Sequence, residues 1–208
     1  MSTPCDGSQA RLLEHLRDRV PPSVLAAVAA VDRRRFVPAA LHDQAWEDRA
    51  LPIDAGQSIS QPSLVAQMAA LVDPRPGDRV LDVGTGSGYH AAVLAQLGRT
   101  VVSIERHAEL SRAAAASLAT AGVGNVQLVI GDGGGGHPAG APYDVISVAA
   151  TVTGEVPPAL IDQLADGGRL LLPIRDGEER LLLIRRDGDR LTRTPHGRVR
   201  FVPFLTTP

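Results

Sequence analysis

The sequence predicts an α/β fold with a mostly parallel sheet, antiparallel C-terminal strands and an N-terminal helical cap. A short apolar strand, 79–83, leads into glycines at alternate positions and then into a helical pattern. Strand and helix patterns alternate from residue 79 to residue 174, which is typical of parallel sheets. Two further strands with a tight turn at Asp187-Gly188 follow, and tight turns join antiparallel neighbours.

Apolar residues at helical spacing predict three helices before the first strand. The first carries its apolar face on residues 12–20 and ends at Pro21-Pro22. The second begins at Pro22 and the third at Pro62, because proline is tolerated in the first turn of a helix. The run Arg33-Arg34-Arg35 is interpreted as a solvated turn, in preference to a site for phosphate or an acidic substrate. Residues 45–59 lack periodicity, and such long loops in compact domains are often functional.

The second part of the chain carries the sheet. The expected strands are 79–83, 101–105, 126–130, 144–149, 169–174, 180–186 and 199–204, and the expected helices are 89–94, 108–121 and 157–164. We therefore divide the chain into a helical cap with a substrate and active-site loop, 1–76, and a cofactor-binding sheet, 77–208. Together they are expected to form one structural unit.

Composition restricts the class of protein. With 208 residues, 44% of them hydrophobic and a net charge of −2, the chain fits one globular domain. There is no basic excess for nucleic acid and no run long enough for a membrane span, so neither partner is expected. The single cysteine, Cys5, excludes an internal disulfide, and the histidines lack zinc-ligand spacing, so no metal is expected. No secretion signal is evident, which predicts a cytoplasmic protein.

Three acidic residues stand at the ends of predicted strands, where ligands bind in open α/β sheets. Glu105 follows Gly84 by 21 positions and suits the two hydroxyls of a ribose. The glycine pattern is G-x-G-x-G, unlike the G-x-G-x-x-G of dinucleotide sites, and Asp82 beside it would repel a pyrophosphate. A cationic ligand such as S-adenosylmethionine fits better, with Asp132 near the adenine amino group. Structural alternatives are an ion pair of Asp82 with Arg79, one of Glu105 with its neighbour, and a turn capped by Asp132.

Five motifs make the chain resemble protein-L-isoaspartate (D-aspartate) O-methyltransferases over about residues 27–205. They are LDVGTGSGYHAAVLAQL (81–97), GQSISQP (56–62), GDGGGGHPAGAPYD (131–144), VPPALIDQLADGGRLLLPI (156–174) and VRFVPF (199–204). The glycine motif is shared by many methyltransferases, whereas GQSISQP and VRFVP are much more specific.

The resemblance implies a class I S-adenosylmethionine-dependent methyltransferase fold, which is Rossmann-like. It also implies methyl transfer from S-adenosyl-L-methionine to the carboxyl group of an L-isoaspartyl residue in a damaged protein or peptide, with S-adenosyl-L-homocysteine as product. Ser60 matches the active-site serine of the family. The implied cofactor contacts are Ile59, Ser60, Asp82, Gly84, Thr85, Gly86, Glu105, Arg106, Asp132 and Gly133.

Ser60 suits this chemistry by its position just before Pro62, at the start of a predicted helix. A carboxylate acceptor is already ionised at neutral pH, so the reaction needs no strong base. We expect the Ser60 hydroxyl and nearby backbone amides to hold that carboxylate at the helix N-terminus. The structural alternative is that Ser60 only caps the helix.

Two departures from the family pattern, Asp54 and the run 149–154, lie where a peptide would approach. They keep a second substrate open, namely an aspartate or another carboxylate of a dedicated peptide. Two further alternatives are a non-catalytic module that binds an adenosyl ligand and a nicotinamide oxidoreductase. The protein is expected to act as a monomer on its protein or peptide substrate.

Overall fold

The computed structural model describes residues 7–205, so Cys5 lies outside the described residues. The helices are α1 Gly7–Leu16, α2 Pro22–Ala30, α3 Pro62–Val72, α4 Tyr89–Ala95, α5 Ala108–Thr120 and α6 Pro158–Asp162. The strands are β1 Leu51–Pro52, β2 Ser58–Ile59, β3 Arg79–Val83, β4 Thr100–Glu105, β5 Val126–Ile130, β6 Tyr143–Val148, β7 Val152–Thr153, β8 Leu164–Asp176, β9 Glu178–Asp187 and β10 Arg190–Arg198. The predicted helix starts at Pro22 and Pro62 are confirmed.

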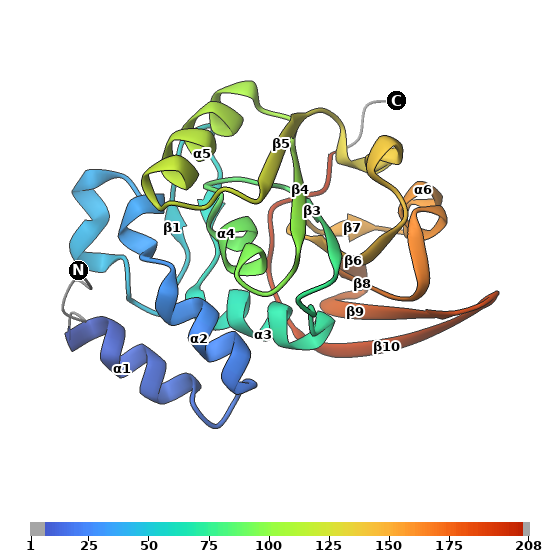
Figure 1. The fold of residues 1–208 in the computed structure, drawn as a ribbon, viewed down its shortest axis with the longest axis horizontal. Coiled ribbons are helices and arrows are strands. Elements are labelled where there is room, and N and C mark those ends of the chain that lie inside the picture. Colours follow the sequence, from blue (N-terminus) through green and yellow to red (C-terminus); the bar gives the residue numbers. More distant parts are fainter. Residues whose placement is uncertain (1–6, 206–208) are drawn as a thin grey trace.

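The large sheet has the strand order β10-β9-β8-β6-β3-β4-β5, and β7 pairs with β8 (Figure 1). Strands β3, β4, β5, β6 and β8 are parallel, whereas β8, β9 and β10 form an antiparallel meander. The mostly parallel sheet with an antiparallel finish is therefore confirmed. The strand order reverses at β3, since the chain adds β4 and β5 on one side and β6 and β8 on the other. Such a reversal opens a crevice at the carboxyl ends of the strands.

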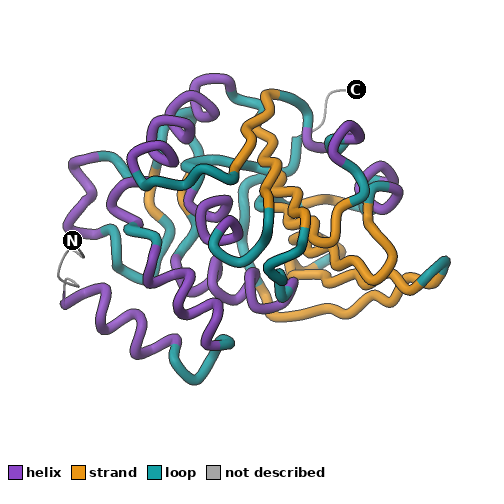
Figure 2. The backbone as a smooth tube through the Cα atoms, in the orientation of Figure 1, coloured by secondary structure: helices purple, strands orange, loops and turns teal. Residues whose placement is uncertain are grey.

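Side chains alternate between the two faces of the sheet, so two apolar clusters form. Val80 belongs to the cluster that α1–α4 cover, and Leu81 belongs to the cluster on the opposite face. Leu160 of α6 packs into that second cluster. Figure 2 shows most helices gathered to the left of the strands. The first cluster takes residues from both sides of position 76, so the cap and the sheet share one core.

Two predicted boundaries and one predicted strand are wrong. The helix expected at 157–164 ends at Asp162, and β8 begins at Leu164 instead of at residue 169, because Leu164 pairs with Tyr143 before a register shift. The strand expected at 199–204 is not formed: after the turn the chain builds β10, and the segment beyond Arg198 runs outside the sheet. Its backbone is held by Thr151 instead.

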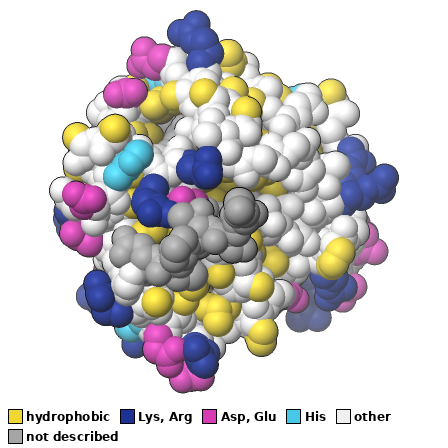
Figure 3. Space-filling view, turned by 60° about the vertical axis from the view of Figure 1, so that its left-hand side comes forward, with side chains coloured by type: hydrophobic (Ala, Val, Ile, Leu, Met, Phe, Trp, Pro, Cys, Tyr) yellow, Lys and Arg dark blue, Asp and Glu magenta, His cyan; other side chains and the backbone are white. Residues whose placement is uncertain are grey.

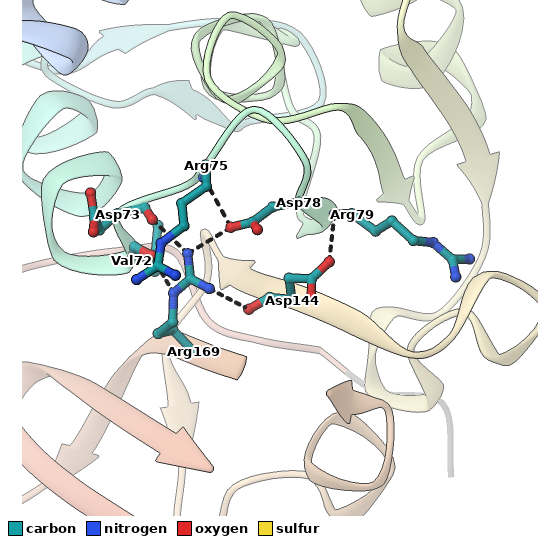
Figure 4. Close-up of polar contacts among 7 residues, drawn as sticks. All are labelled: Val72, Asp73, Arg75, Asp78, Arg79, Asp144 and Arg169. Carbon is teal, nitrogen blue, oxygen red and sulfur yellow. Dashed lines mark hydrogen bonds and ion pairs between the residues drawn. The ribbon is translucent and has the colours of Figure 1, made fainter. Parts of the chain in front are cut away.

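A buried arginine joins the segments at the amino ends of the parallel strands (Figure 4). Arg169 of β8 donates to the carbonyls of Val72, at 2.8 Å, and Asp144, at 3.3 Å. It also pairs with the Asp78 carboxylate at 2.7 Å, and the two side chains are 8% and 12% exposed. Asp78 further accepts the backbone N–H of Arg75 at 2.9 Å. This cluster fixes the end of α3 and the start of β3. It lies at the amino ends of the strands, opposite the crevice.

Charges of both signs are interspersed on the face seen in Figure 3, outside the grey atoms. Within residues 7–205 no helix has the length and apolar character needed to cross a membrane.

We expect Asp78→Ala to lower the free energy of unfolding by about 2–4 kcal/mol, because it leaves the buried Arg169 guanidinium without its carboxylate. Urea unfolding followed by circular dichroism measures the change. Asp189→Ala, at the exposed β9–β10 turn, serves as the control and should cost less than about 0.5 kcal/mol. Equal stability of the two variants would contradict this account of the cluster.

Candidate active site

A cavity opens at the carboxyl ends of β3 and β4, in the crevice where the strand order reverses. Eight of the ten predicted cofactor contacts line it: Ile59, Ser60, Gly84, Thr85, Gly86, Glu105, Arg106 and Gly133. We call it the inner cavity. The two remaining residues, Asp82 and Asp132, are not among its lining residues.

The glycine loop after β3 folds over the end of β4. Gly84 and Gly86 have φ angles of +95° and +53°, in the region that side chains disfavour, which explains glycine at both positions. The amides of Gly84 and Thr85 donate to the carbonyl of Ile104 at 2.9 and 3.1 Å. This geometry brings backbone atoms, instead of side chains, to the wall of the inner cavity.

Glu105, the last residue of β4, lies in that wall. Its two carboxylate oxygens accept the backbone N–H groups of Gly86, at 2.9 Å, and His107, at 3.0 Å. These bonds fix the carboxylate, and each oxygen keeps a further lone pair for a ligand. The arrangement is compatible with two ribose hydroxyls.

Asp82 differs from the expectation because it lies inside the protein. Its side chain is fully buried, accepts the Ser103 hydroxyl at 2.7 Å and contacts the His90 Nδ1 at 3.3 Å. Ser103 in turn bonds to the Thr85 hydroxyl at 2.6 Å. Asp82 thus supports the glycine loop through the hydroxyls of Ser103 and Thr85, and the alternative ion pair with Arg79 is not formed.

Asp132 caps the turn that follows β5. Its Oδ1 accepts the backbone N–H of Gly134 at 2.8 Å, which is the structural alternative considered for this residue. The neighbouring Gly133 does line the inner cavity, and a Cβ there would overlap the Val83 side chain. The backbone at Gly133 therefore packs closer to Val83, which also lines the cavity, than a residue with a side chain could.

Arg33 overturns the interpretation of the arginine run as a solvated turn. Its side chain is fully buried and donates to three carbonyls, those of Ala45, Arg49 (3.3 Å) and Ser60 (2.9 Å). The guanidinium lies 5.7 Å from the centre of the Tyr89 ring, a cation–π distance. Burial lowers the pKa of Arg33 to about 10, so the group stays charged at neutral pH. One cation therefore fixes the loop that carries Ser60.

The start of α3 offers fewer free amides than expected. Pro62 has no N–H, and the N–H of Ser63 donates to the Asp48 carboxylate at 3.0 Å. The N–H groups of Leu64 and Val65 both donate to the Gln61 carbonyl, at 3.1 and 3.2 Å. The amides of the first helical turn are thus occupied. Ser60, just before this turn, is one of the polar residues that line the inner cavity.

The segment 199–205 closes the inner cavity from the other side. Val202 accepts the N–H of Thr151, and Phe204 donates to the Thr151 carbonyl, both at 2.8 Å. Glu179 accepts the Thr151 hydroxyl and the N–H of Phe201, both at 2.6 Å. Burial raises the pKa of Glu179, but these hydrogen bonds together with the Arg175 cation outweigh it and hold the pKa below its usual value.

Ser60 also lines a second hollow, which we call the outer groove. It shares Ser58, Ser60, Ala149 and Val202 with the inner cavity. Its other lining residues are Ala50, Gln61, Leu64, Gln67, Arg198, Val199, Arg200 and Phe201. Ser60 is therefore one of four residues that line both hollows.

Several lining residues of the inner cavity were not predicted as site residues. Tyr89 and His90 belong to α4, directly after the glycine loop, and residues 202–205 belong to the C-terminal segment. The VRFVPF motif was a signal for the second group. Nothing in the local sequence separates Tyr89 and His90 from ordinary helix residues.

We expect Arg33→Met to lower the free energy of unfolding by about 2–4 kcal/mol, because buried carbonyls lose their donor. Trp46, which is 3% exposed and adjoins Ala45, reports the change through its fluorescence during urea unfolding. Arg35→Met is the matched control, since Arg35 is exposed and its hydrogen bond goes to the Thr120 carbonyl. A variant at position 33 as stable as this control would refute the structural role.

We expect Glu179→Gln to destabilise the protein at neutral pH but not in acid. A carboxylate whose folded pKa is depressed stabilises the protein above its unfolded pKa, and this contribution disappears as the pH falls through the folded pKa. The stability difference between the variant and the unaltered protein should therefore shrink below about pH 4.5. Thermal unfolding from pH 3 to pH 7 measures it. Glu178→Gln, in an exposed ion pair, should show no comparable trend.

Comparisons with known proteins agree over nearly the whole chain. The family model described as protein-L-isoaspartate(D-aspartate) O-methyltransferase (PCMT) matches residues 8–207. The protein-L-isoaspartate O-methyltransferase of Methanoculleus marisnigri is 48% identical over 184 residues, which cover 88% of this chain and 83% of that protein. The enzyme of that name from Methylorubrum populi is 46% identical and covers 96% of each chain.

A solved structure confirms the fold class. A Plasmodium falciparum protein described as a protein-L-isoaspartate O-methyltransferase, in complex with S-adenosyl-L-homocysteine, superposes with a TM-score of 0.85. The match covers 97% of this chain and all of that one, at 23% identity, and so speaks for the fold alone. From the family match and the two relatives, the chain belongs to the protein-L-isoaspartate (D-aspartate) O-methyltransferase family.

Proposed function

We propose that this chain transfers a methyl group from S-adenosyl-L-methionine to the free carboxyl group of L-isoaspartyl residues in damaged proteins or peptides. The family match supports the reaction. The observation that carries the assignment to this site is the position of Ser60, which lines both the inner cavity and the outer groove. A donor in one hollow and a peptide in the other would meet at this residue.

The inner cavity fits the adenosyl cofactor by its donor set. Glu105 would accept the ribose hydroxyls, and the backbone at 84–86 and at Gly133 would lie against the rest of the ligand. When bound, the cofactor supplies an activated methyl group on a sulfonium. We propose Asp82 and Asp132 as indirect contributors, because they order the loops whose neighbouring residues line the cavity.

The chain's own contribution to the reaction is positioning. The acceptor carboxylate is ionised at neutral pH, so no side chain has to remove a proton. The Ser60 hydroxyl donates a hydrogen bond to that carboxylate and holds it in line with the methyl group. Residues 202–205 cover the inner cavity and exclude water from it.

We also propose that residues 1–76 and residues 77–208 have different roles in the reaction. The first part supplies the loop with Ser60, and the second supplies the glycine loop, Glu105 and the C-terminal segment. The shared apolar core supports a functional division within one folding unit.

The test is methylation of an isoaspartyl peptide against its aspartyl twin, with labelled S-adenosylmethionine. We expect transfer to the isoaspartyl peptide, and about a 10–100-fold lower kcat for Ser60→Ala, the worth of one hydrogen bond to a charged group. Binding of S-adenosylhomocysteine, measured by calorimetry, should be unchanged in this variant.

Ser63→Ala is the control, because Ser63 lies in the same stretch but lines neither hollow. Unaltered turnover in Ser60→Ala would remove the proposed role of the hydroxyl. Preference for the aspartyl peptide would favour a dedicated peptide substrate, and cofactor binding without transfer to either peptide would favour a non-catalytic module.

A further inference from the structure

The outer groove, which we propose to hold the peptide, is positively charged. Two of its lining residues, Arg198 and Arg200, are cations, and none of its lining residues is acidic. The remaining lining residues are apolar or neutral, with Gln61 and Gln67 among them. A carboxylate near the groove, that of Asp48, is already bonded to the N–H of Ser63.

The two arginines differ in their partners. Arg198 pairs with Glu178, which also pairs with Arg180 at 3.0 Å, so one carboxylate serves two cations. Arg200 is exposed and forms no ion pair with any residue between 7 and 205. Glu179, the other acidic residue beside the segment, is bonded to Thr151, to the Phe201 amide and to Arg175. Arg200 therefore contributes a charge that its neighbours do not neutralise.

The backbone holds Arg200 firmly at the groove. On one side the N–H of Val199 donates to the Glu179 carbonyl at 3.1 Å. On the other side the N–H of Phe201 donates to the Glu179 carboxylate at 2.6 Å. The side chains of Val199 and Phe201 pack against the core, so that of Arg200, between them, stays in solvent. A cation on a fixed backbone loses less freedom on binding than one on a mobile loop.

From this arrangement we infer that the enzyme prefers isoaspartyl sites flanked by acidic residues, and that Arg200 is the residue that determines this preference. The inference rests on the proposed function, since it concerns the neighbours of the methylated residue. A guanidinium presents a planar pair of donors that matches a carboxylate. Arg198 supplements the charge but shares Glu178, so its effect is smaller.

The test uses three isoaspartyl peptides that are identical except for the residues on both sides of the isoaspartate, which are glutamate, glutamine or lysine. We expect kcat/KM to fall from the glutamate to the glutamine to the lysine peptide, by about two- to fivefold per step, the range of exposed ion pairs. The differences should diminish at 0.5 M salt, where the Debye length is short.

Arg200→Gln should reduce the differences in kcat/KM among the three peptides. Arg190→Gln is the matched control. It removes the same charge at the start of β10, in the hairpin that projects away from α3 in Figure 1, and should keep the full preference.

Fluorescence anisotropy of labelled peptides in the presence of S-adenosylhomocysteine separates this inference from the proposed function. Methylation of the glutamine peptide supports the function whatever the order of the three. Equal binding of all three peptides, or an unchanged preference in Arg200→Gln, overturns the inference about the groove. Charge-ordered binding without methylation would leave the groove selective and reject the reaction instead.

Discussion

The site depends on a buried cation whose hydrogen bonds, among the described residues, all go to backbone carbonyls. Arg33 is removed from water, and removing a charge from water is costly unless its donors find acceptors. Its two terminal nitrogens do so, whereas its buried Nε has no partner among the described residues. Here three carbonyls from one loop, at positions 45, 49 and 60, converge on a single guanidinium. The planar fork of arginine can serve several acceptors at fixed angles, which a lysine ammonium cannot match. The requirement is mutual, because those carbonyls need a donor and the guanidinium needs acceptors.

This interaction also connects the cap with the sheet. The Arg33 guanidinium lies over the ring of Tyr89, the first residue of α4, which directly follows the glycine loop. Tyr89 in turn packs near Phe36, with 5.7 Å between ring centres. The loop with Ser60 and the loop that lines the inner cavity thus share one support. A displacement of either loop would disturb the other.

The sequence predicted the location of the site better than the orientation of its side chains. Glycines at positive φ and acidic residues at strand ends were enough to predict a ligand site at the edge of the sheet. Glu105 faces the cavity because it ends β4, whereas Asp82 lies one position inside β3, beside Ser103 in register. Which side of a strand end a carboxylate takes depends on such cross-strand neighbours, and these are not adjacent in sequence.

Residues whose partners are distant in sequence account for the main errors. Three consecutive arginines resemble a solvated turn, and only the convergence of 45, 49 and 60 shows that Arg33 is buried. The alternating apolar pattern at 199–204 resembles a strand, but its hydrogen bonds go to Thr151 and Glu179.

The irregular path of this C-terminal segment matters for the proposed reaction. The segment is held at separate points instead of being paired along its length. Different parts of it can therefore line different hollows. The segment from Arg198 to Leu205 contacts both the inner cavity and the outer groove, and Val202 is common to them. The proposed methyl transfer depends on the alignment of donor and acceptor, and the C-terminal segment lies along the hollows proposed for both.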